Sequence, residues 1–161
     1  MSGVFMMNWI ARVAVIGALA AAAEWATAAE VDAATELEGQ SLQQLQRAVA
    51  DGYIEDINDR QRWRRGELPF EAVAINDERR IKLADELLRR CLQLRDADLV
   101  HLSLIYHHDR APRSRYLALA TALLLAERDE SQSNRMELAL DRFLMHIGKP
   151  QAFDTQRPRV P

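Results

Sequence analysis

The sequence predicts an all-α fold, a small array of antiparallel helices arranged as helical hairpins, with an irregular C-terminal tail. Three observations support this prediction. Apolar residues recur three and four positions apart in several segments, which is the period of an amphipathic helix. No segment of strand length alternates polar and apolar residues. Capping residues, glycines and prolines separate the helical segments by short loops, so consecutive helices are expected to run antiparallel.

The first helices are expected soon after residue 40. Ser41 and Gln44 form the capping-box pattern that begins a helix, and Gly52 is predicted to end it. A second, short helix is predicted over 55–63, followed by a turn over 64–69 where glycine and proline interrupt the pattern. The N-terminal part of the domain is therefore expected to contain two separate helices.

The next helix carries the clearest amphipathic stripe. Asn76 or Asp77 is expected to cap it. Cys91, the only cysteine in the sequence, lies on this stripe, which predicts a buried and unpaired thiol. The residues of the stripe are Ile81, Ala84, Leu88, Cys91 and Leu92.

Three more helices are predicted in the second half of the chain. The middle one is apolar nearly all round, which predicts that it is the central helix of the array. The tail over 149–161 has no periodic pattern and is expected to be irregular. The expected starts are Asp96, Ala111-Pro112 and Ser131 or Ser133, and the expected ends are about His108 for the first and Gly148 with Pro150 for the last.

The N-terminus has the pattern of an export signal. Residues 13–23 are apolar and uncharged, which is the length of a signal-peptide core and too short to span a bilayer. Ala26-Thr27-Ala28 supplies the small residues that precede a cleavage site. An uncleaved membrane anchor is the alternative, because Glu24 and Trp25 separate the apolar run from that site.

These features define the expected domains and compartment. We expect a signal peptide over 1–28, a flexible leader over 29–40 and a single helical domain over 41–161. An exported protein of this kind is expected in the periplasm or in the medium.

Composition and missing motifs exclude several classes of protein. The net charge of −3 gives no reason to expect a nucleic acid as partner. No later apolar stretch is long enough to span a bilayer, so no membrane contact is expected after signal cleavage. Phosphate loops, Gly-x-Ser-x-Gly, Cys-x-x-Cys and His-x-x-x-His motifs are missing, so neither a cofactor nor a metal is expected. A monomer that binds a small ligand or a partner protein remains the expectation.

Two histidines are the first candidates for chemistry. His101 and His108 lie seven residues apart, which places them on one face of their helix about 10 Å apart. Imidazoles in such positions can donate and accept a proton near neutral pH. They are a poor pair for one metal ion, because helical ligands normally lie three or four residues apart. Partly buried, hydrogen-bonded histidines at a helix end are the structural alternative.

Charged residues give further candidates, each with a simpler explanation. Asp56 and Arg60 are spaced for a surface ion pair on one helix. Asp141 and Arg142 interrupt the apolar pattern of the last helix. If they do not belong to a site, they lie on the solvated face of this helix. The basic segment over 60–65 contains one tryptophan and could contact phosphates or anionic lipid head groups, although the acidic turn before it cancels much of its field.

Four segments resemble an uncharacterised family of bacterial proteins, a domain of unknown function. The family carries Asp-Gln-x-x-Asp-Arg, His-Ala-Ala-x-x-x-Gln-His and Asp-Arg-Tyr-Leu segments and a Gly-x-Pro-Gln-x-Tyr-Gly-Thr-Gln tail, of which the tail is the most specific. The similar segments, over roughly 53–156, are Glu55-Asp-Ile-Asn-Asp-Arg60, His101-Leu-Ser-Leu-Ile-Tyr-His-His108, Asp141-Arg-Phe-Leu144 and Gly148-Lys-Pro-Gln-Ala-Phe-Asp-Thr-Gln156.

The resemblance implies one site but no reaction. The sequence departs from the family pattern at several positions, among them Phe143 and Phe153, where the family has tyrosine. Asp154 stands where the family has glycine, which puts a tight turn of the tail in doubt. The residues that the resemblance implies for the site are Asp59, Arg60, His101, His108, Asp141, Arg142, Gln151 and Gln156.

Two functions follow as hypotheses. The first is a binding module whose polar groove holds a small ligand, a peptide or a partner protein. The second is a metal-independent hydrolase or phosphodiesterase, with His101 and His108 as acid and base and Arg142 stabilising negative charge. In either case the tail after Gly148 is expected to fold over the His101 helix and bring Gln151 to this site.

Overall fold

The computed structural model describes residues 39–91 and 93–156. The predicted signal peptide and most of the predicted leader lie outside these residues. The described residues form helices and connections without any strand, which confirms the all-α prediction. The helices are α3 (Leu42–Arg64), α4 (Phe70–Arg90), α5 (Asp96–His108), α6 (Pro112–Arg128), the short 3-10 helix η2 (Glu130–Gln132) and α7 (Ser133–His146).

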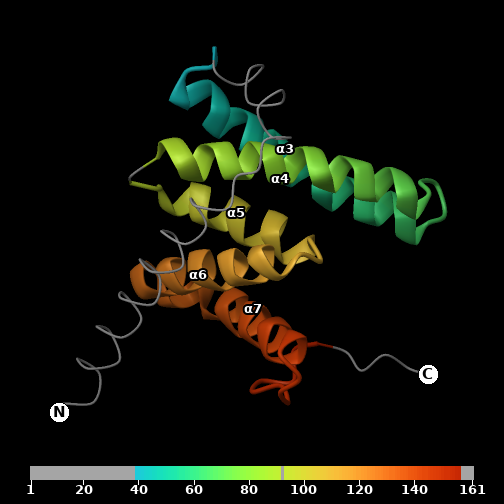
Figure 1. Cartoon of the computed structure of the whole chain (residues 1–161), viewed down its shortest axis with the longest axis vertical. Helices are drawn as coiled ribbons and strands as arrows, with labels where there is room; N and C mark the ends of the chain where they lie inside the picture. The colour runs from blue at the N-terminus through green and yellow to red at the C-terminus, as the bar shows by residue number, and fades with distance from the viewer. Residues whose placement is uncertain (1–38, 92, 157–161) are drawn as a thin grey trace.

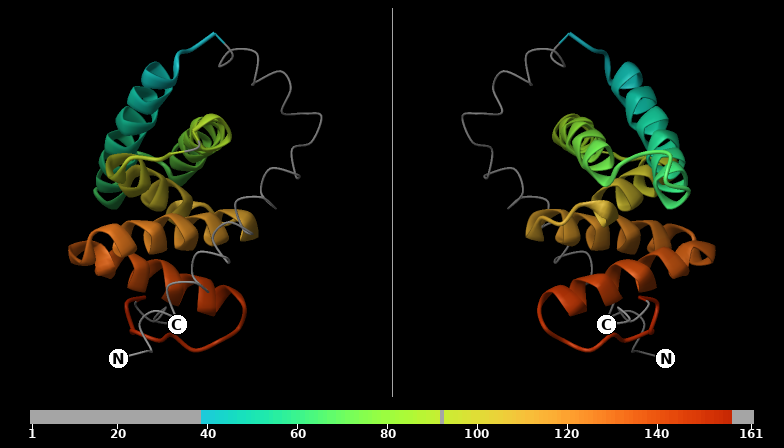
Figure 2. Two further views of the ribbon diagram at one scale, coloured as in Figure 1. Left: turned by 90° about the vertical axis from the view of Figure 1, so that its left-hand side faces the viewer. Right: turned by 90° about the vertical axis from the view of Figure 1, so that its right-hand side faces the viewer.

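The helices stack in the order in which they occur in the sequence. The two longest, α3 and α4, form an antiparallel hairpin, and α5 packs against both (Figure 1). Helix α6 lies between α5 and α7 (Figure 2). The prediction that α6 is the central helix is wrong, because α5 packs against α3, α4 and α6 and takes that place. No helix within the described part of the chain is long and apolar enough to cross a membrane.

Helix α3 is continuous through Gly52, so the prediction of two short helices is wrong. Gly52 is buried, and a β-carbon built there would lie 3.5 Å from Cγ of Arg80 on α4. A glycine inside a helix costs about 1 kcal/mol of helix propensity relative to alanine. Close packing of the Arg80 side chain over the glycine offsets this cost, which a propensity argument does not consider.

Helix α4 begins six residues earlier than its predicted cap at Asn76. Pro69 has an extended conformation, with φ −69° and ψ 151°, and the helix starts directly after it. Asn76 and Asp77 lie inside the helix, where their side chains bind residues of α3 instead of capping. Helix α4 ends at Arg90, so Cys91 follows it as a half-buried free thiol, 3.0 Å from the carbonyl oxygen of Gln93, and not as a fully buried stripe residue.

The later helices start within one or two residues of their predicted positions. Asp96 is the first residue of α5 and not its cap, because Arg95 has the extended cap conformation. Helix α6 begins at Pro112 as predicted. Ser133 begins α7 without capping it, and Ser131 lies in η2. Gly148 follows α7 with φ +71°, the left-handed conformation expected after a helix.

The apolar core lies where the hairpin meets α5 and α6. Unusually many charged side chains are buried beside it, and these determine the candidate site described next. The buried charged residues are Asp56, Asp59, Arg80, Glu86, Asp98 and Asp141, and the core cluster includes Leu45, Val49, Leu87, Leu102, Ile105, Tyr106 and Leu117.

Candidate functional site

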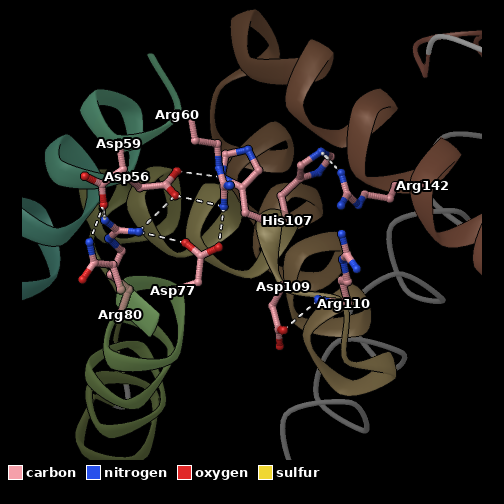
Figure 3. Close-up of polar contacts among 11 residues, drawn as sticks. Asp56, Asp59, Arg60, Asp77, Arg80, His107, Asp109, Arg110 and Arg142 are labelled. Carbon is pink, nitrogen blue, oxygen red and sulfur yellow. Dashed lines mark hydrogen bonds and ion pairs between the residues drawn. The ribbon is translucent and has the colours of Figure 1, made fainter. Parts of the chain in front are cut away.

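A buried arginine on α4 is the centre of a cluster of carboxylates. The side chain of Arg80 is only 1% exposed. Its Nη1 lies 2.8 Å from Oδ1 of Asp77 and 3.5 Å from Oδ1 of Asp56, and its Nη2 donates to Asp59. Figure 3 shows the three carboxylates surrounding this guanidinium group. A buried charge costs several kcal/mol unless it is paired, and these contacts supply the pairing.

A second arginine pairs with two of these three carboxylates. Nη2 of Arg60 lies 3.2 Å from Oδ1 of Asp56 and 2.7 Å from Oδ2 of Asp77. The predicted pair of Asp56 and Arg60 therefore exists, but Asp56 is 1% exposed and belongs to the interior instead of the surface. Nδ2 of Asn76 donates to Asp59 at 2.9 Å and completes the cluster.

His108 connects this cluster to helix α5. Its Nδ1 lies 2.6 Å from Oδ2 of Asp56. Burial favours the neutral acid, but the hydrogen bond and charge of His108 and then the arginine charges outweigh it, so the pKa of Asp56 is lowered. At Asp77 burial prevails over the Arg60 contact, and its pKa is raised.

The neighbouring His107 contacts α7. Its ring is edge-on to the His108 ring, with centroids 5.6 Å apart. Nη1 of Arg142 lies 3.2 Å from Nε2 of His107, and Figure 3 shows the two side chains pointing toward one another. An arginine can only donate, so Nε2 accepts and a neutral ring carries its proton on Nδ1.

His107 lies in a positive environment. Burial lowers its pKa, and the charges of Arg142, His108, Arg115 and Arg60 lower it further, to about 3. Arg115 is half-buried and has no ion pair with any described carboxylate. The Nε atoms of Arg60 and Arg115 are buried donors without a hydrogen-bond acceptor among the described residues. Positive charge and unsatisfied donors are therefore found around the neutral His107.

The C-terminal tail folds onto α7 and not over the His101 helix. The buried carboxylate of Asp141 accepts hydrogen bonds from the backbone N–H groups of Ala152, Phe153 and Thr155, at 2.6, 2.9 and 2.8 Å, and from the Thr155 hydroxyl at 2.8 Å. Asp141 is therefore not on a solvated face. Asp141 and Ala139, two residues before it, are the buried residues of α7, and the tail covers Asp141.

The two glutamines of the tail bind each other. Nε2 of Gln151 donates to the carbonyl oxygen of Gln156 at 3.0 Å, and the Gln156 N–H donates to Oε1 of Gln151 at 2.7 Å. Asp154 adopts φ +55°, so the turn forms even without the glycine of the family pattern. Aspartate tolerates this left-handed conformation better than most residues do.

His101 lies in a separate environment. Its ring is 4.7 Å from the Tyr53 ring of α3, and its Nδ1 is buried without a hydrogen-bond partner among the described residues. Burial lowers its pKa, and the nearby charges are those of Asp98, Arg95 and Arg135. None of these residues belongs to the cluster around His108.

The structure thus divides the residues implied by the sequence into groups. Asp59, Arg60 and His108 share the cluster around Arg80, whereas Asp141, Gln151 and Gln156 organise the tail. Arg142 joins α7 to His107, and His101 stays apart. The expected convergence of His101, His108, Arg142 and Gln151 does not occur.

The sequence interpretation missed Arg80, Asp77, His107 and Arg115. One signal could have identified Arg80, because it lies seven residues from both Val73 and Leu87, which are buried on the same face of α4. No comparable pattern distinguishes His107 or Arg115, whose roles depend on contacts between helices.

Comparisons with known proteins give no further guide. No family model, curated protein or solved structure matches this chain. Within the described residues no group of His, Cys, Asp and Glu side chains is arranged to hold a metal ion. Any functional assignment therefore depends on the geometry of the side chains.

Proposed function

We propose that this protein is a binding module that recognises an anionic group, a carboxylate or a phosphate, beside His107. The proposed contacts are Arg115 on α6 and Arg142 on α7. The observation that supports this most strongly is Arg115, a half-buried arginine that has no described carboxylate partner and whose Nε donor is unsatisfied.

An anionic ligand would complement the positive charge around His107. The Arg142 guanidinium donates to the neutral imidazole of His107, which places its positive charge beside the ring. A guanidinium group presents its donors in a planar fork that matches carboxylate and phosphate oxygens. Two such groups near one imidazole therefore favour an anionic ligand over a neutral one.

The Arg80 cluster is better suited to support than to reaction. Arg80, Asp56 and Asp59 are buried and satisfy one another. Through the bond from Asp56 to His108, the cluster fixes the end of α5 from which His107 projects. The module would thus present a rigid binding surface, which reduces the ordering cost of binding.

Thermal unfolding in increasing inorganic phosphate or acetate tests this proposal. A ligand that binds only the folded state raises the melting temperature. At a ligand concentration a hundred times Kd it adds about 2.7 kcal/mol to the free energy of unfolding. Arg115→Met should abolish the increase. Arg47→Met, which removes an exposed arginine of α3, should leave it unchanged. An increase that persists in Arg115→Met would refute this site.

One observation favours a second function, a hydrolase with His108 as general base. The contact of Nδ1 with the buried carboxylate of Asp56 orients the ring, as in catalytic aspartate–histidine pairs. Phosphodiesterase or esterase activity that disappears in His108→Gln, with the fold retained, would support this function over simple binding.

We further propose that the chain is exported with its first 28 or 29 residues removed, and that it is related to the bacterial family it resembles. The apolar run over 13–23 and the small residues at 26–28 support export. Intact mass of the protein from its native host tests the cleavage, and a mass that retains Met1 would contradict it.

A further inference from the structure

The end of the α3–α4 hairpin carries exposed aromatic rings. Trp63 and Phe70 are 43% and 37% exposed, and their rings lie 5.7 Å apart across the connection. The guanidinium carbon of Arg110, from the connection between α5 and α6, lies 5.3 Å from the centroid of the Phe70 ring. In Figure 1 this end of the hairpin projects beyond the ends of the other helices.

Arginines outnumber carboxylates around the aromatic pair, whose acidic neighbours are the exposed Glu67 and Glu71. Arg62, Arg64 and Arg65 are exposed in the last turn of α3 and directly after it. Arg65 is paired with Glu67 at 2.6 Å, whereas no described carboxylate forms an ion pair with Arg62 or Arg64. The hairpin tip, defined here as Arg62, Trp63, Arg64 and Phe70, therefore combines cations with apolar rings.

The acidic residues that precede the tip in the sequence do not neutralise it. Asp56 and Asp59 are buried and are paired with Arg80, and Glu55 is paired with Arg79. In the sequence these carboxylates appeared to cancel the field of the basic segment. In the folded chain their charge is directed toward other arginines, and the cations at the tip face solvent.

We propose that the hairpin tip binds the surface of an anionic phospholipid bilayer. Trp63 and Phe70 would enter the interface, where aromatic rings are favoured, and Arg62 and Arg64 would contact lipid phosphates. This is peripheral contact and not a span, so it departs from the expectation of no membrane contact, which considered only spanning segments. It is independent of the proposed site at Arg115, with which the tip shares no residue.

A bilayer fits the tip better than a soluble polyanion does. The chain has a net charge of −3, which opposes wrapping by an extended polyanion such as a nucleic acid. A projecting pair of aromatic rings also gains most from a neighbouring apolar phase, which a bilayer supplies and a polyanion does not.

Tryptophan fluorescence of the full chain tests the proposal. The sequence has three tryptophans, and the substitutions Trp9→Phe and Trp25→Phe leave Trp63 as the only fluorescent one. Vesicles of phosphatidylglycerol and phosphatidylcholine should shift its emission to shorter wavelength, and brominated lipids should quench it. Vesicles of phosphatidylcholine alone should do neither, even if the apolar segment over 13–23 holds the chain on them.

Matched charge reversals distinguish the tip from the rest of the chain. With Arg62→Glu and Arg64→Glu together, the lipid concentration that gives half of the emission shift should rise about tenfold or more. The control variant combines Arg47→Glu on α3 with Lys82→Glu on α4, two exposed positions of the same hairpin. It makes the same change of charge and should have little effect on the emission shift. Circular dichroism establishes that both variants are folded. An unshifted Trp63, equal loss in both variants, or an equal response to polyglutamate or single-stranded DNA would overturn the proposal.

Discussion

Asp141 shows how much structure one buried carboxylate can organise. It accepts four hydrogen bonds from residues 152–155 and so holds the tail against α7. Burial favours its neutral form, but the hydrogen bonds from the tail outweigh this and lower the pKa of Asp141 from 3.8 to about 2. The ionised carboxylate is therefore a structural element of the folded state.

The first prediction concerns the pH dependence that Asp141 causes. Because its pKa is lower in the folded than in the unfolded state, its contribution is complete above the ordinary value of 3.8 and is lost as pH falls toward 2. Asp141→Asn should lower the melting temperature at neutral pH by several degrees and make stability less dependent on pH in this window. Thermal unfolding at a series of pH values measures both effects. A variant with the same slope as the wild type would refute this role.

The second prediction compares two neighbouring arginines. Arg80→Leu leaves Asp56 and Asp59 without their buried partner and should cost about 3–5 kcal/mol of unfolding free energy. Arg79→Leu removes only an exposed pair with Glu55 and should cost at most about 1 kcal/mol. Urea denaturation of both variants gives the difference, and equal costs would contradict a buried network.

At the scale of elements, α3 depends on its packing against α4. The capping box at Ser41 was readable from the sequence and is present, with Ser41 and Gln44 exchanging hydrogen bonds at 2.8 and 3.2 Å. The continuation through Gly52 was not readable, because it depends on Arg80, which is distant in the sequence. Local signals thus located the helix start and the turn after Arg64, whereas tertiary contact explains why the helix continues through Gly52.

The third prediction tests this packing. Gly52→Ala should raise the unfolding free energy by about 0.5–1 kcal/mol, because the added methyl group would make ordinary contact with Arg80 and alanine favours helix. Gly52→Leu should instead destabilise the protein, since its longer side chain would displace Arg80 from the carboxylates. Chemical denaturation of the two variants measures the change in unfolding free energy for each. If Gly52→Ala destabilises the protein, the space between Gly52 and Arg80 does not accommodate a methyl group, and the expectation is wrong.

At the scale of the whole molecule, buried polar side chains link the hairpin to the later helices. Arg80 binds Asp56, Asp56 binds His108, and the adjacent His107 binds Arg142 on α7. Periodicity predicted the helical class and most helix positions, because these depend on short sequence distances. It could not predict which histidine meets Arg142, since that depends on how α5 is rotated against α7.

The most direct test of the account is nitrogen-15 NMR of the histidine rings during pH and phosphate titrations. We predict that His107 stays neutral, with its proton on Nδ1, from about pH 8 to pH 5, because its pKa is about 3. Inorganic phosphate should shift the His107 resonances and leave those of His101, which lies beside Tyr53, unchanged. Titration of His107 near its ordinary value of 6.5, or resonances unaffected by phosphate, would contradict an anion site built around this ring.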